Sequence, residues 1–178
     1  MSNETYYLSE RVGHMLRAER LTLAVAESCT GGLLGGLLTE VPGSSEYFLG
    51  GVIAYADEIK QHLLGVSPET LAAHGAVSAE VALEMARGVR SATGASLAVS
   101  ITGVAGPGGG TPDKSVGLTY VGLVGPAVEQ VERRVWQGDR PGNREASAEL
   151  ALRMVLTYLA ERELTRAVTP GSGSEDIS

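Results

Sequence analysis

A short apolar run at residues 21–26 stops at Glu27-Ser28-Cys29-Thr30-Gly31-Gly32, and this change restricts the fold more than any other feature of the chain. Leu21, Leu23 and Val25 suit a buried strand, and the two glycines permit a tight turn close to a ligand. The stretch therefore predicts a strand that runs straight into a helix. Free N–H groups at a helix start can hold an anion or a developing oxyanion, so we expect the reactive centre here.

The rest of the chain alternates apolar runs with amphipathic segments. Strands are predicted at residues 48–55, 97–101, 116–124 and 128–136, the last two forming a hairpin near a sheet edge. Helices are predicted at residues 5–18, 33–39, 68–74, 79–93 and 143–163, with a further helix starting near residue 56. Strands separated by helices predict a layered α/β domain with a mixed sheet and a site in loops at strand ends.

Composition narrows the class of protein. With 178 residues the chain fits one domain, which we place at residues 1–166, followed by a loose tail at 167–178. The net charge of -7, from 21 acidic and 14 basic residues, argues against a broad nucleic-acid-binding face. Cys29 is the one cysteine, which excludes an internal disulfide. No signal pattern or membrane-spanning run is visible, so we expect a soluble, cytoplasmic protein that does not bind membranes.

Ser28 is the first candidate nucleophile. Its place between a strand and a glycine-rich helix start resembles a nucleophile elbow, although the hydrolase pattern G-x-S-x-G is absent. A serine before a helix is more often a cap. Cys29 is a second candidate nucleophile, since a helix start favours a thiolate. The alternative is that Cys29 is not reactive and serves only as a small buried side chain.

A serine nucleophile needs a base, and the sequence offers few. None of the three histidines has a recognisable partner: His14, His62 and His74. The chain has only two lysines, Lys60 and Lys114, and Lys60 follows a strand end as Ser28 does. A lysine partly removed from water loses its proton more readily, so Lys60 is a candidate base, with a solvated helix lysine as the alternative. Tyr55 lies shortly before Lys60, at the end of the strand. It either relays a proton or holds the lysine in place, or it only contributes to packing.

Two further features suit a phosphate. The loop Gly103–Thr111 can cradle one with its N–H groups, although it matches neither the P-loop nor the Rossmann pattern, and a flexible surface turn is equally compatible. Arg140 and Arg144 meet at the start of the last predicted helix, where they form either a phosphate clamp or exposed ion pairs with nearby acidic residues.

Several long motifs, in one order, resemble the CinA C-terminal domain family. They are Ala26–Gly32, Gly51–Tyr55 with Lys60, His74–Ser78, Ser100–Lys114 and Gly138–Arg140. Stand-alone members of that family include bacterial nicotinamide-mononucleotide amidohydrolases. The resemblance implies a three-layer α/β/α sandwich with a mixed, mostly parallel sheet, often oligomeric, and a serine/lysine amidohydrolase that needs no metal or cofactor.

The same resemblance assigns roles to particular residues. Ser28 would be the nucleophile, Lys60 the general base and Tyr55 a residue beside the pair. Substrate-binding residues would be Thr30, Gly31, Gly32, Thr102, Gly106, Gly109, Arg140 and Arg144. The implied reaction converts nicotinamide mononucleotide, a small-molecule partner, to nicotinic acid mononucleotide and ammonia. The alternative is a non-catalytic nucleotide-binding or protein-interaction module linked to competence or the DNA-damage response.

Overall fold

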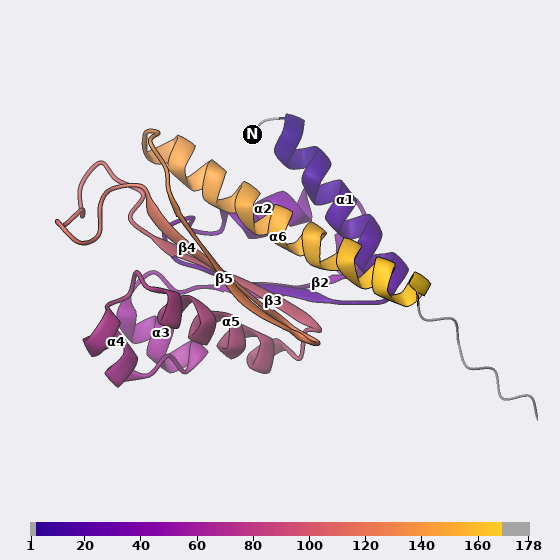
Figure 1. Cartoon of the computed structure of the whole chain (residues 1–178), viewed down its shortest axis with the longest axis horizontal. Coiled ribbons are helices and arrows are strands. Elements are labelled where there is room, and N and C mark those ends of the chain that lie inside the picture. The colour runs from indigo at the N-terminus through magenta and orange to yellow at the C-terminus, as the bar shows by residue number, and fades with distance from the viewer. Residues whose placement is uncertain (1–2, 169–178) are drawn as a thin grey trace, which may run out of the picture.

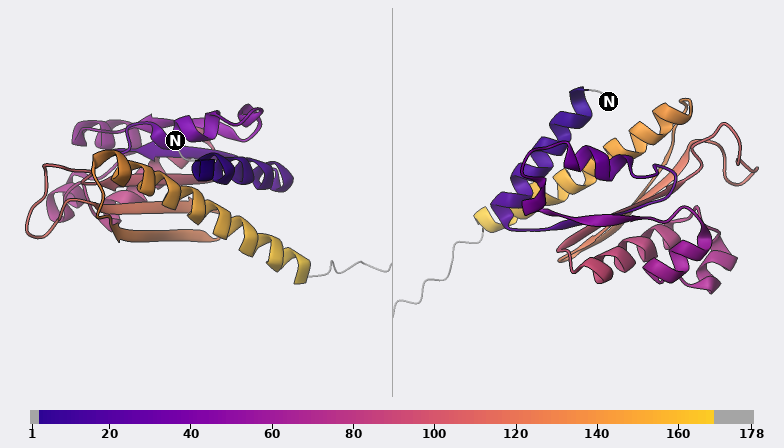
Figure 2. Two further views of the ribbon diagram at one scale, coloured as in Figure 1. Left: turned by 90° about the horizontal axis from the view of Figure 1, so that it is seen from above. Right: turned by 180° about the vertical axis from the view of Figure 1, so that it is seen from behind.

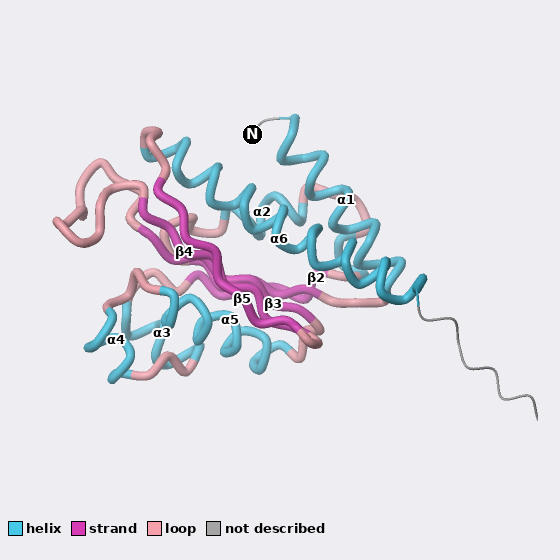
Figure 3. Tube along the Cα trace, in the orientation of Figure 1, coloured by secondary structure: helices cyan, strands magenta, loops and turns pink. Residues whose placement is uncertain are grey.

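The structure is a computed structural model, and it describes residues 3–168. One five-stranded sheet has the order β2-β1-β3-β4-β5. Figures 1 and 3 show this sheet nearly edge-on, between two layers of helices. The strands are β1 (Leu23–Glu27), β2 (Phe48–Ile53), β3 (Leu97–Gly103), β4 (Leu118–Gly125) and β5 (Val128–Val135). The helices are α1 (Asn3–Glu19), α2 (Leu33–Thr39), α3 (Asp57–Leu64), α4 (Pro68–His74), α5 (Ala79–Thr93) and α6 (Arg140–Val168), with a short 3-10 turn η1 (Ser44–Glu46).

Helices cover both faces of the sheet. α1, α2 and α6 lie on one face, and α3, α4 and α5 lie on the other, as Figure 1 and the two further views in Figure 2 show. β1 pairs in parallel with β2 and β3, whereas β3–β4 and β4–β5 are antiparallel. The predicted three-layer sandwich with a mixed sheet is confirmed, and its parallel pairs lie on the β2-β1-β3 side.

The two faces of the sheet differ in side-chain size. Alternate strand residues point to opposite faces, so Leu23 and Val25 join the large core beneath α1, α2 and α6, while Ala24 and Ala26 face α5. The small residues let α5 lie close against the sheet. A Cβ at Gly122 of β4 would stand only 2.9 Å from the carbonyl oxygen of Ala82 in α5.

Local signals account for most element ends. The side chains of Ser67 and Ser78 cap α4 and α5, and Gly94 ends α5 in the left-handed conformation. α6 starts at Arg140, three residues earlier than predicted, because the Asp139 carboxylate accepts the N–H of Gly142 at 2.9 Å and so caps the helix. The predicted tail lies outside the described residues from residue 169 onward, and α6 reaches Val168.

The three parallel strands end at one edge of the sheet. Glu27, the last residue of β1, pairs with Ile53 of β2 and with Ile101 of β3. The segments that follow these strands therefore meet in space. Within residues 3–168, none of the helices has the length and apolar character needed to cross a lipid bilayer.

Candidate active site

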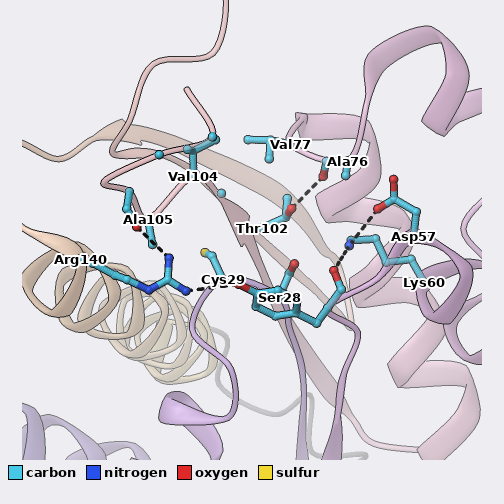
Figure 4. A pocket seen from close by; sticks show the side chains of 15 residues that line it. Ser28, Cys29, Asp57, Lys60, Ala76, Val77, Thr102, Val104, Ala105 and Arg140 are labelled. Carbon is cyan, nitrogen blue, oxygen red and sulfur yellow. Dashed lines mark hydrogen bonds and ion pairs between the residues drawn. The ribbon is translucent and has the colours of Figure 1, made fainter. Parts of the chain in front are cut away.

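Ser28 lies in the turn between β1 and α2. Its N–H donates to the carbonyl oxygen of Ile101 at 2.9 Å, which fastens the turn to β3. Gly31 and Gly32 take the left-handed conformation, with φ values of 60° and 94°, and let the chain reverse into α2. The Ser28 side chain is 8% exposed and lines a pocket of 280 Å³ at the carboxyl edge of the sheet (Figure 4).

The buried side chain of Glu27 holds this turn in place, a role that the sequence analysis did not predict. Its carboxylate is 1% exposed and accepts the N–H groups of Gly32, Leu34 and Gly35 at 3.1, 3.1 and 2.8 Å. The start of α2 is therefore occupied by a carboxylate of the chain itself. Of the N–H groups from Ser28 to Gly35, all except those of Cys29 and Thr30 donate to oxygens of the described residues.

Lys60 comes from the first turns of α3 and lines the same pocket. It is 2% exposed, and its Nζ donates to the carbonyl oxygen of Tyr55 and to Asp57 Oδ1, both at 3.2 Å. Figure 4 places Ser28 between Lys60 and Arg140, yet no hydrogen bond within residues 3–168 joins Ser28 to Lys60. The ion pair with Asp57 requires the ammonium form of the lysine.

Asp57 is a pocket residue that sequence reasoning also missed. A signal was present, because an acidic residue three positions before a lysine in a helix lies beside it. The spacing identifies a neighbour of Lys60 without revealing that both side chains face the pocket.

Tyr55 and Arg140 also line the pocket and contact each other. Tyr55 follows β2 and is 61% exposed, and its hydroxyl accepts a hydrogen bond from Arg140 Nη2 at 3.2 Å. Arg140 Nη1 donates to the carbonyl oxygen of Gly106 at 2.8 Å. The arginine thus links the β2 end, the start of α6 and the glycine-rich loop after β3, which projects beyond the sheet in Figure 1. Its guanidinium is placed to meet an anion at the pocket mouth.

The remaining wall comes from β3, its following loop and the α4–α5 connection. Thr102 is buried, and its hydroxyl donates to the carbonyl oxygen of Ala76 at 2.7 Å. Gly106 and Gly109 also line the pocket. Seven of the predicted site residues therefore lie around one pocket: Ser28, Tyr55, Lys60, Thr102, Gly106, Gly109 and Arg140.

Four predicted substrate-binding residues are not among those that line the pocket: Thr30, Gly31, Gly32 and Arg144. Thr30 is completely buried, and within the described part of the chain its hydroxyl has no hydrogen-bond partner. Arg144 Nη2 donates to the carbonyl oxygen of Thr30 at 2.6 Å. The arginine is thus engaged by the backbone of the Ser28 turn.

Cys29 lines the pocket beside Ser28 and is 7% exposed. Burial raises the pKa of its thiol to about 11, because the thiolate is disfavoured away from water. At neutral pH the side chain is therefore a neutral thiol and a poor rival to Ser28. Lys114, the other lysine, donates to the carbonyl oxygen of His74. Among the described residues, no cluster of three or more His, Cys, Asp and Glu side chains could hold a metal ion.

Comparison with known proteins finds relatives along most of the chain. The CinA C-terminal domain family matches residues 5–159. The CinA-like protein of Chlorobaculum tepidum is 52% identical over 161 residues, which cover 88% of this chain and 38% of that protein. The CinA-like protein of a Cyanothece species is 52% identical over 159 residues, covering 89% of this chain and 37% of that protein.

Solved structures of CinA-type proteins have the same fold as this chain. The competence/damage inducible protein CihA from Agrobacterium tumefaciens superposes with a TM-score of 0.86 at 37% identity, covering 90% of this chain and 98% of that one. A CinA superfamily protein from Klebsiella pneumoniae gives a TM-score of 0.85 at 32% identity over 88% of this chain and 98% of its own. The chain spans 37–38% of the length of the two CinA-like relatives. The chain belongs to the CinA C-terminal domain family.

Proposed function

We propose that the chain is an amidohydrolase that converts nicotinamide mononucleotide to nicotinic acid mononucleotide and ammonia. The observation that carries the proposal is the pocket at the carboxyl ends of β1, β2 and β3, which Ser28 and Lys60 both line. A serine hydroxyl and a lysine amine in one pocket form the smallest set that supports serine/lysine acyl transfer. Arg140 at the pocket mouth supports a substrate that carries a phosphate.

In this mechanism Ser28 Oγ attacks the carboxamide carbon, and the serine proton passes to the neutral Nζ of Lys60. Lys60 then gives that proton to the departing nitrogen, which leaves as ammonia. Water hydrolyses the resulting acyl-enzyme with the same lysine as proton acceptor, which releases the carboxylic acid and regenerates Ser28. Because only the amine can accept a proton, Lys60 must first give up its ion pair with Asp57.

The developing oxyanion needs donors close to Ser28. The N–H groups of Cys29 and Thr30 are those of the turn that Glu27 and the neighbouring carbonyl groups do not use. The N–H of the residue after a nucleophile is the usual first donor of such a site. We therefore assign the oxyanion to these two amides in place of the start of α2.

Ammonia release from nicotinamide mononucleotide by the purified chain tests the proposal. Ser28→Ala and Lys60→Ala should abolish turnover, since each removes one reacting group. Cys29→Ala is the matched control on the same turn and should keep most of the activity. Normal turnover by Ser28→Ala would show that the proposed mechanism is wrong.

One observation favours a second function. Lys60 is held by Asp57 and by the Tyr55 carbonyl group, without a hydrogen bond to Ser28 in the described residues, and a pocket used only for binding would need nothing more. The alternative is therefore a non-catalytic nucleotide-binding module. Saturable binding of the mononucleotide without ammonia release would favour it.

A further inference from the structure

We infer that Arg144 is a positioning residue for the Ser28 turn and that it acts through the Thr30 carbonyl group without contacting the substrate. The inference rests on the proposed function, in which Ser28 is the nucleophile. It separates Arg144 from Arg140, although the two arginines stand one turn apart in α6 and sequence reasoning gave both of them to a phosphate.

The contacts of the two guanidinium groups differ. Arg144 Nη2 donates to the Thr30 carbonyl oxygen at 2.6 Å, and a Cβ built on Gly31 would stand 3.6 Å from the same nitrogen. The guanidinium thus lies over the turn, is half-buried and is not among the groups that line the pocket. Arg140 is exposed, lines the pocket and bonds to the hydroxyl of Tyr55.

The turn has an anchor on its other side as well. The Glu27 carboxylate accepts the N–H of Gly32 at 3.1 Å from within the core. The segment from Ser28 to Gly32 is therefore held at two points: Arg144 binds the carbonyl group of Thr30, and Glu27 binds the N–H of Gly32. Gly31 and Gly32 give this segment more backbone freedom than other residues would. Two charged hydrogen bonds from different elements restrict that freedom, which keeps Ser28 oriented toward the pocket.

A positioning role and a binding role predict different kinetics. Loss of orientation at the nucleophile lowers kcat and leaves ground-state binding nearly unchanged, whereas loss of a phosphate ligand raises KM. For Arg144→Met we expect kcat to fall about tenfold or more with KM within about twofold of the parent. Arg144→Lys should recover part of kcat, because an ammonium can still donate to the Thr30 carbonyl group.

The matched control is Arg140→Met on the same helix. It should raise KM for nicotinamide mononucleotide and weaken competitive inhibition by inorganic phosphate, while Arg144→Met leaves phosphate inhibition unchanged. A higher KM and weaker phosphate inhibition in Arg144→Met, with kcat unaffected, would make Arg144 a substrate ligand and overturn the inference.

Cys29 provides a readout that needs no turnover. It is the one cysteine of the chain, belongs to the turn and is only 7% exposed, so its alkylation by iodoacetamide speeds up when the turn loosens. Both arginines favour its thiolate through their charge, and loss of charge alone would slow alkylation in both Met variants. Release of the turn predicts faster alkylation in Arg144→Met only.

The two hypotheses fail in different ways. Absence of ammonia release by the parent chain would refute the proposed function, while the alkylation rates would still test the anchoring of the turn. Unchanged kcat together with unaccelerated alkylation in Arg144→Met would refute the positioning role, whatever the parent protein catalyses. Arg144→Lys keeps the test decisive if the Met variant folds poorly, since it should alkylate at nearly the parent rate.

Discussion

Glu27→Gln is the substitution that most directly tests how the Ser28 turn is held in place. The carboxylate accepts three N–H groups from the start of α2, at 3.1, 3.1 and 2.8 Å. α2 depends on this cap, because its own N-cap residue is Gly32 with no side-chain bond and its seven residues include two glycines. Glutamine has nearly the same shape but only one accepting oxygen.

The expected cost follows from those bonds. In the best orientation the glutamine oxygen keeps the two N–H groups bound to Oε2, and its NH2 group then faces the N–H of Gly35. A hydrogen bond to a charged group contributes about 1.5–3 kcal/mol, and a buried N–H left without an acceptor costs about 1–3 kcal/mol. Removal of a buried charge offsets part of this. We expect a net loss of about 2 kcal/mol, which is roughly 4–8 °C in Tm for a chain of this size.

Thermal unfolding followed by circular dichroism measures the shift, with Glu40→Gln as control. Glu40 stands exposed at the opposite end of α2, so its substitution makes the same charge change where a carboxylate is not a cap. The Glu40 variant should melt within about 1 °C of the parent. If Glu27→Gln also melted there, the carboxylate would not be the cap of α2, and the account of the turn would be refuted.

Three other outcomes follow from single contacts. Because burial raises the pKa of Cys29 to about 11, its rate of reaction with iodoacetamide should rise about tenfold per pH unit between about pH 8 and pH 10, and a plateau near pH 9 would contradict this. Gly88→Ala should lower the free energy of unfolding in urea by about 1–3 kcal/mol, because its Cβ would collide with the Leu64 carbonyl oxygen, whereas Gly36→Ala, which has open space around it, should raise it by up to about 1 kcal/mol. Equal effects of the two substitutions would refute the close packing of α3 on α5. Burial would raise the pKa of Glu19, but hydrogen bonds from Arg162 and Arg166 outweigh burial and lower the pKa, so the carboxylate stabilises the fold above the ordinary pKa of 4.5 and this stabilisation is lost as pH falls through the lower folded-state pKa. Glu19→Gln should therefore be less stable than the parent at neutral pH and equally stable in acid. A stability difference that persists in acid would contradict the assignment.

Much of the fold could be predicted from local pattern. The helix predicted at residues 33–39 has the observed bounds of α2, Leu33–Thr39, and Ser67 and Ser78, the caps of α4 and α5, stand directly before the helices predicted at residues 68–74 and 79–93. The start of α6 was placed three residues late, because Pro141-Gly142-Asn143 was interpreted as the turn that leads into the helix, whereas Asp139 caps it and Pro141 and Gly142 lie in its first turn. The difference in size between the two faces of the sheet was present in the alternation of Leu23, Ala24, Val25 and Ala26.

The site was only partly readable. Parallel strand ends explain why Ser28 and Lys60 were expected together, since that follows from topology. The roles of Glu27 and Arg144 did not follow, because each acts on the backbone of a turn brought to it by the fold. A glutamate that ends a strand looks like a solvated residue, and a second arginine near a helix start looks like a phosphate ligand. Backbone partners leave no trace in a pattern of side chains.

The two groups proposed to react come from different layers of the fold, and this limits which substitutions the site can tolerate. Ser28 is carried by the sheet and α2, whereas Lys60 is carried by α3, which packs on α5 beneath the opposite face of the sheet. The separation between them therefore depends on how closely α5 approaches the sheet, which the small residues at Ala24, Ala26 and Gly122 determine. A larger side chain on that face would lift α5 and α3 together and carry Lys60 away from Ser28 without touching either residue. The alanine and glycine face of the sheet thus helps to set the geometry of the candidate site as well as forming part of the core.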